Sequence, residues 1–147
     1  MKMVSFIDIS PSKVISEFIY KENQDFSELD QIILVPNYLV LEAMFQTAGR
    51  VAREYSNNKC GGSIVSFSNF NLVRPIFCNE LLHIKAELIS FNQHRRCFFL
   101  GVSVYKDQEV IVKDGRLLII QDTAIQPQFL NNRYPVDINH YLEKLGF

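Results

Sequence analysis

The sequence predicts an α+β fold in which an antiparallel β-sheet packs against one long helix. Residues 38–55 form an apolar segment of helical length that contains no proline. Several segments around it alternate apolar and polar residues with a period of two, which is typical of strands with one buried face. The later strands follow one another on short connections, which favours antiparallel pairing.

Two strands are expected before the helix, at residues 4–9 and 14–20. Both segments are apolar and rich in β-branched residues, and the turn-forming sequence Ser10-Pro11-Ser12 separates them. The polar residues 21–30 are then expected to form a loop that leads toward the helix.

The helix is expected to begin just after Pro36, with Asn37 as its N-cap. Apolar side chains cover most of its circumference, and a helix of this kind is usually buried. These apolar residues are Leu39, Val40, Leu41, Ala43, Met44, Phe45, Ala48, Val51 and Ala52.

About four strands are expected after the helix, at residues 63–73, 82–89, 98–104 and 110–112. Residues 117–120 either continue the last strand or follow it as a separate one. All of these elements fall in a single domain over residues 1–122, and residues 123–147 form a C-terminal extension with a candidate short helix at 137–145.

Composition excludes several classes of function. Hydrophobic residues make up 48% of the chain and charged residues 21%, as in a globular domain. The formal net charge of -1 gives no electrostatic footprint for nucleic acid. No apolar run reaches the ~20 residues of a membrane span. The 3 cysteines lack metal-ligand spacing, which favours reduced thiols in the cytoplasm.

Glu42 is the strongest candidate for acid–base chemistry. It lies in the predicted helix between Leu41 and Ala43, and a carboxylate in such surroundings is a candidate general acid or base. The alternative is a charged stripe on the helix, because Glu42, Gln46 and Arg50 recur at helical spacing. Charged stripes of this kind are more often solvated faces than catalytic sites.

Other chemical motifs are missing from the sequence. Gly61-Gly62 stands without the further glycines and the lysine of a phosphate-binding loop. The three histidines, His83, His94 and His140, are too scattered to suggest a metal site. We therefore expect no metal and no cofactor.

The segment from Val35 to Gln46 resembles the start of the central helix in 3-hydroxyacyl-acyl-carrier-protein dehydratases of the hotdog fold. That family has Pro-Gly, several apolar residues, an acidic residue, Ala-Met and Gln, and the sequence here reads Pro-Asn-Tyr-Leu-Val-Leu-Glu-Ala-Met-Phe-Gln. The later segment 70–76 resembles the family's Arg-Pro turn, and residues 80–84 resemble its following strand. The likeness covers residues 4–122 and implies a sheet wrapped around a central helix.

The chain departs from the family pattern at three places. A gapless comparison puts Glu28 where the family has its catalytic histidine, and no His-Phe-Pro-Gly loop surrounds it. Asn37 replaces the glycine at the helix start, and Cys78-Asn79-Glu80 replaces Pro-Gly-Asp after the Arg-Pro turn. Without the histidine, one of the two acid–base roles of a dehydratase is unfilled.

The resemblance implies a homodimer or higher oligomer that binds acyl-carrier-protein or coenzyme A thioesters in the cytoplasm, with an acyl tunnel along the dimer interface. Glu42 and, as a weaker candidate, Glu28 are then catalytic, and Asn37, Tyr38 and Gln46 contact the substrate. Three functions stay open: a 3-hydroxyacyl-thioester dehydratase, a thioesterase with Glu42 as base, and a non-catalytic protein that binds acyl groups or pairs with an active homologue.

Overall fold

The computed structural model describes residues 3–21, 34–57 and 62–121 of the chain. These residues contain one long helix and six strands, which confirms the predicted α+β class. The elements are β1 Ser5–Ile9, β2 Lys13–Phe18, α1 Asn37–Tyr55, β3 Gly62–Ser68, β4 Leu82–Asn92, β5 Cys97–Lys106 and β6 Glu109–Gln121.

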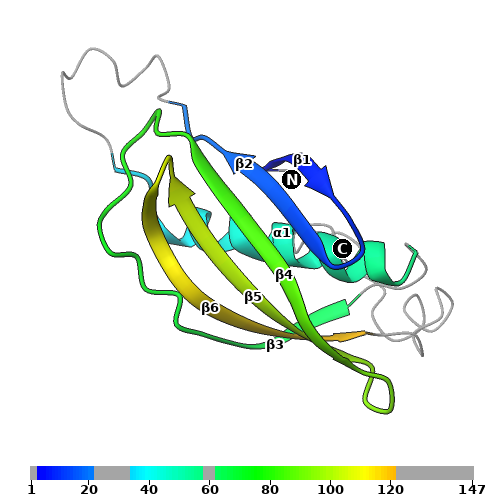
Figure 1. Cartoon of the computed structure of the whole chain (residues 1–147). Coiled ribbons are helices and arrows are strands. Elements are labelled where there is room, and N and C mark those ends of the chain that lie inside the picture. The colour runs from blue at the N-terminus through cyan, green and yellow to red at the C-terminus, as the bar shows by residue number, and fades with distance from the viewer. Residues whose placement is uncertain (1–2, 22–33, 58–61, 122–147) are drawn as a thin grey trace, which may run out of the picture.

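The six strands form one antiparallel sheet in the order β1-β2-β4-β5-β6-β3. The sheet is strongly curved, and α1 lies along one of its faces (Figure 1). Strands β1 and β3 form the two edges of the sheet. Because β3 pairs with β6 at one edge and β4 lies between β2 and β5, the segment between β3 and β4 has to pass the turn between β5 and β6 to reach β4.

The core lies between the sheet and α1, and nine residues of the helix are buried. Val40, Thr47 and Val51 have no exposed surface and share one side of the helix at helical spacing. They pack with the inward-facing residues of the central strands, such as Ile84 and Val102. The helix is therefore buried, as its apolar circumference predicts.

Two buried hydroxyl groups join the helix to the sheet. The Thr47 hydroxyl on α1 donates to the Ala43 carbonyl at 2.9 Å and lies 2.6 Å from the Ser16 hydroxyl on β2. A hydroxyl has one proton, so the Ser16 hydroxyl is the donor to Thr47. Both side chains are fully buried, and the pair fixes the position of the helix along β2.

Several predicted boundaries differ from the observed ones. The helix begins at Asn37 itself and its N-cap is Pro36, so the prediction of Asn37 as N-cap is wrong. Strand β3 ends at Ser68 because Asn69, with a φ of 61°, takes the left-handed conformation and turns the chain. The two predicted segments 110–112 and 117–120 belong to the single strand β6.

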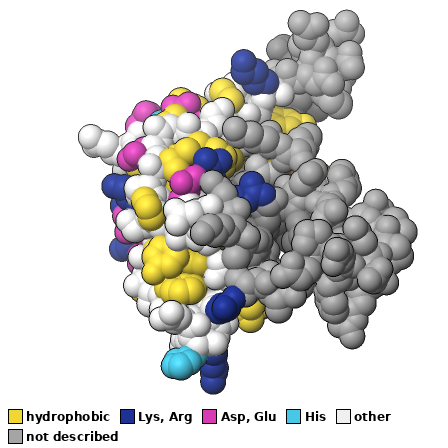
Figure 2. Space-filling view, turned by 90° about the vertical axis from the view of Figure 1, so that its right-hand side faces the viewer, with side chains coloured by type: hydrophobic (Ala, Val, Ile, Leu, Met, Phe, Trp, Pro, Cys, Tyr) yellow, Lys and Arg dark blue, Asp and Glu magenta, His cyan; other side chains and the backbone are white. Residues whose placement is uncertain are grey.

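The surface at the end of the molecule where α1 terminates is mixed in character. Among the described residues visible there, small hydrophobic patches alternate with positive and negative side chains (Figure 2). No helix in the described part of the chain is long and apolar enough to cross a membrane. The predicted extension over residues 123–147 lies outside the described residues.

Replacing Thr47 by valine should destabilise the fold. The Thr47→Val substitution keeps the shape of the side chain but leaves the buried Ser16 hydroxyl without its acceptor, which costs about 1–3 kcal/mol. Chemical denaturation would measure the loss. The double variant Ser16→Ala/Thr47→Val should recover part of it because no unpaired donor remains, and a double variant less stable than Thr47→Val would contradict this account.

Candidate functional site

A pocket lies beside the first two turns of α1. Its volume is about 450 Å³, which is within the range of small-molecule sites. One wall comes from the helix, and the other from the end of β3 and the connection that follows it. Most of its side chains are aliphatic or aromatic. The lining residues are Asn37, Tyr38, Leu41, Met44, Phe67, Phe70, Asn71 and Leu72.

The N-terminus of α1 reaches the pocket with its backbone donors uncapped. Pro36 is the N-cap, makes no side-chain cap hydrogen bond, and no acidic residue occupies the first turn. The N–H of Leu39 donates to the Pro36 carbonyl at 3.0 Å, whereas none of the described residues accepts a hydrogen bond from the N–H groups of Asn37 or Tyr38. A helix N-terminus carries a partial positive charge, so this end of the pocket favours a negatively charged oxygen.

The connection between β3 and β4 forms the outer wall, and backbone hydrogen bonds hold it in place. The N–H of Val73 donates to the Ile111 carbonyl of β6 at 2.9 Å. The N–H of Val35, just before α1, donates to the Ile76 carbonyl at 2.7 Å. The connection therefore ties the start of the helix to β6.

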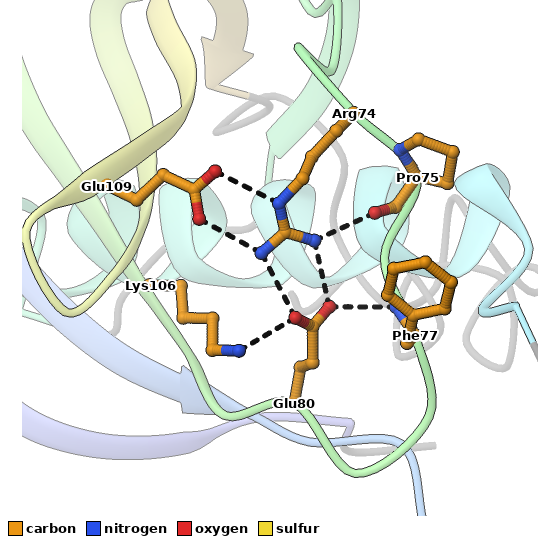
Figure 3. A network of polar contacts seen from close by, with 6 residues as sticks. All are labelled: Arg74, Pro75, Phe77, Glu80, Lys106 and Glu109. Atoms are coloured by element: carbon orange, nitrogen blue, oxygen red, sulfur yellow. Dashed lines mark hydrogen bonds and ion pairs between the residues drawn. The ribbon is translucent and has the colours of Figure 1, made fainter. Parts of the chain in front are cut away.

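Arg74 anchors this connection to the turn between β5 and β6, and all five of its N–H donors are used (Figure 3). Two bonds of 3.0 Å reach Glu80 and two of 3.0 Å reach Glu109. The fifth, at 2.8 Å, reaches the Pro75 carbonyl. We call Arg74, Glu80, Glu109 and Lys106 the Arg74 cluster.

Glu80 is the most enclosed charge of the Arg74 cluster, with 13% of its side chain exposed. Its carboxylate also accepts from the Lys106 ammonium and from the Phe77 N–H, both at 2.8 Å. The hydrogen bonds from Arg74 lower the Glu80 pKa from 4.5 to about 2, and the bonds to Glu80 and Glu109 raise the pKa of Arg74. Glu80 and Arg74 are therefore both charged at neutral pH.

The structure brings only part of the predicted site together. Asn37 and Tyr38 line the pocket, and Glu42 is half-buried one turn beyond Tyr38 without lining it. Gln46 is 3% exposed, and its side-chain oxygen accepts from the Met3 N–H at 2.9 Å, so this amide holds the N-terminal segment against α1. Glu28 lies outside the described residues.

The outer wall of the pocket contains two residues that no motif in the sequence identifies. Phe67 and Phe70 both line it. The two phenylalanines stand just before Arg74 and Pro75, and this closeness to the Arg-Pro turn was the available signal.

The described histidines lie away from this site. His83 is on β4 between inward-facing residues, so it points away from the helix, and it contacts Glu17 of β2 at 3.4 Å. His94 lies in the turn between β4 and β5. Within the part of the chain that the structure describes, no three His, Cys, Asp or Glu side chains gather into a possible metal site.

Known structures share this architecture, although no protein-family model and no curated protein sequence matches the chain. The dehydratase heterocomplex ApeI:P from Xenorhabdus doucetiae aligns with a TM-score of 0.66 and 15% identity over 90% of this chain and 88% of that one. A hypothetical thioesterase with coenzyme A from Streptococcus pneumoniae gives 0.64 and 13% over 81% and 85%. Zebrafish thioesterase superfamily member 2 gives 0.62 and 11% over 81% and 80%.

These similarities establish the fold of the chain. Its antiparallel sheet curved around one long helix is the hotdog fold, as the helix motif predicts. At such low identity the alignments define architecture and leave the chemistry to the residues of the site.

Protonating Glu80 should loosen the Arg74 cluster. Its pKa is 4.5 when unperturbed and about 2 in the fold, so its stabilising contribution is complete above pH 4.5 and is lost as pH falls toward 2. The Glu80→Gln variant should be less stable than wild type at neutral pH, and this difference should shrink between those two pH values. Denaturation across this pH range would measure it, and a difference independent of pH would contradict the role of the carboxylate.

Proposed function

We propose that this protein binds an acyl thioester, with the acyl chain in the pocket and the thioester carbonyl at the N-terminus of α1. The observation that carries the proposal is the pocket itself, whose aliphatic and aromatic walls end at the uncapped N–H groups of Asn37 and Tyr38. Apolar walls suit a hydrocarbon chain. Free N–H donors at a helix N-terminus suit the negative charge that develops on a thioester oxygen during reaction.

Glu42 is the proposed acid–base group. It follows Tyr38 by four positions on α1, which brings the two Cβ atoms to about 5–6 Å of each other on the helix surface. Its half-buried carboxylate makes no hydrogen bond or ion pair with the described residues, whereas Glu54 on the same helix is bound to Arg50 at 2.8 Å. Glu42 is thus available for proton transfer beside the pocket.

The first candidate reaction is reversible removal of water from a 3-hydroxyacyl thioester. It is favoured by the Glu-Ala-Met-Phe-Gln sequence at 42–46, which resembles the dehydratase helix. Glu42 takes the proton from the carbon next to the carbonyl, and the N–H donors stabilise the negative charge that develops on the carbonyl oxygen. The protonated Glu42 then returns this proton to the 3-hydroxyl group, which leaves as water.

The second candidate is thioester hydrolysis, and it is favoured by the position of the histidines. His83 and His94, the histidines in the described part of the chain, are remote from the pocket. Hydrolysis needs one base: Glu42 takes a proton from water, the water oxygen attacks the carbonyl, and the thiol leaves with that proton. In both readings the protein acts as a homodimer or higher oligomer on coenzyme A or carrier-protein thioesters in the cytoplasm.

Removing the Glu42 carboxylate should abolish turnover and spare binding. Glu42→Gln keeps the size of the side chain and should lower the rate by about 10²–10⁴, the contribution of one acid–base group. Mass spectrometry of 3-hydroxyacyl and enoyl coenzyme A thioesters would measure the rate. Loss or gain of one water would identify a dehydratase, and release of free thiol would identify a thioesterase.

Glu54→Gln is the matched control, because it removes the same charge from the same helix at a surface ion pair worth little energy. It should leave turnover unchanged. Equal rates for Glu42→Gln and wild type would remove Glu42 from the reaction. Acyl-thioester binding without turnover in the wild type would identify a non-catalytic acyl-binding protein.

A further inference from the structure

The pocket has an aromatic wall that the proposed reaction does not use. The rings of Phe67 and Phe70 line the pocket, and Phe45 of α1 packs behind both. Ring centroids are separated by 5.3 Å for Phe45 and Phe67, 5.9 Å for Phe45 and Phe70, and 5.6 Å for Phe67 and Phe70. Each ring thus packs against the other two, at the centroid separations usual for aromatic pairs.

This aromatic wall stands at the end of the pocket away from the helix start, where Phe67 is 52% exposed and Phe70 is half-buried. Phe45 follows Asn37 by eight residues on α1, which corresponds to about 12 Å along the helix axis. A hydrocarbon chain that starts at the N–H groups of Asn37 and Tyr38 and follows α1 therefore meets Phe70 and Phe67 within about that distance, because helical side chains such as Phe45 lean toward the N-terminus. Met44, which is fully buried, lines the pocket on the core side.

Phe70 lies against a glycine of β6. A Cβ on Gly115 of β6 would lie 2.7 Å from Cε1 and 2.9 Å from Cδ1 of the Phe70 ring, and 2.8 Å from the Val102 carbonyl oxygen. Real Cβ atoms essentially never come this close, so the ring occupies space that any other residue at 115 would fill.

The backbone on both sides of this contact is bent to allow it. Asn69, just before Phe70, has a φ of 61°, and Asp114, just before Gly115, has a φ of 57°. Residues other than glycine rarely adopt this left-handed backbone conformation, and among them Asn and Asp tolerate it best. The register between β5 and β6 also shifts between Val102 and Val104. Two unusual residues thus direct Phe70 onto Gly115.

We propose that Phe70, seated on Gly115, sets the far end of the acyl pocket and so determines the longest acyl chain that this protein binds. The inference rests on the proposed function, since it requires an acyl chain in the pocket. It assigns a specificity role to Phe70, whose ring packs where a side chain at residue 115 would otherwise lie.

Binding of straight-chain S-alkyl-coenzyme A thioethers of increasing length would test this role, because a thioether is not hydrolysed. Calorimetry of the wild type should show affinity rising about fourfold per added methylene until the chain meets Phe70, and no further rise beyond that length. In Phe70→Ala the rise should continue for about two to four more methylenes, because the ring's space is vacated. Affinity for the shortest chains should stay unchanged.

Phe91→Ala is the matched control, since Phe91 belongs to a separate aromatic group with Tyr55 and Phe98 outside the pocket. It should leave the limiting length unchanged. Gly115→Ala does not make a second test, because its Cβ would also lie 2.8 Å from the backbone carbonyl oxygen of Val102, a contact that Phe70→Ala does not relieve. Phe70→Ala and its control therefore decide the matter.

The outcomes separate the two proposals. If the wild type binds alkyl chains and Phe70→Ala leaves the limiting length unchanged, or weakens all lengths equally, the role of Phe70 is wrong and the acyl pocket stands. If alkyl chains of every length bind the wild type no better than coenzyme A itself, the acyl pocket is wrong and the role of Phe70 falls with it.

Discussion

The geometry of the pocket depends on one guanidinium group. The segment between β3 and β4 forms the outer wall without being a strand, so it has no continuous ladder of hydrogen bonds to fix it. Arg74 fixes the segment instead, because its five N–H groups donate to two carboxylates and one backbone carbonyl. Only a planar fork of five donors can do this, and the three donors of a lysine ammonium could not replace it.

The helix serves the fold and the pocket with different faces. Val40, Thr47 and Val51 face the sheet and belong to the core, whereas Asn37 and Leu41 face the pocket. Glu42 borders the pocket face, four residues after the pocket-lining Tyr38. The core face packs the helix against the sheet, so residues on the pocket face and at position 42 can differ without changing this packing. The hotdog scaffold can therefore carry different reactions on the same helix.

Local patterns in the sequence were enough to predict the helix, the strands and their antiparallel order, because each depends on periodicity and short connections. The predicted end of β3 is wrong because Asn69 takes a left-handed conformation that no apolar pattern signals. The pocket was only half predicted. Asn37 and Tyr38 share one turn of helix, but Phe70 reaches them through tertiary packing on Gly115, a contact between residues far apart in the chain.

The uncapped start of α1 has a consequence for how this protein could change over evolution or in the laboratory. A serine, aspartate or asparagine at an N-cap position is one of the simplest ways to stabilise a helix, by about 1 kcal/mol. Here such a side chain would occupy the same N–H groups that the proposed substrate needs. A capping side chain introduced at residue 36 to raise thermal stability would therefore compete with the ligand for these N–H groups. The helix start is less stable without such a cap, but its N–H groups stay open to a ligand.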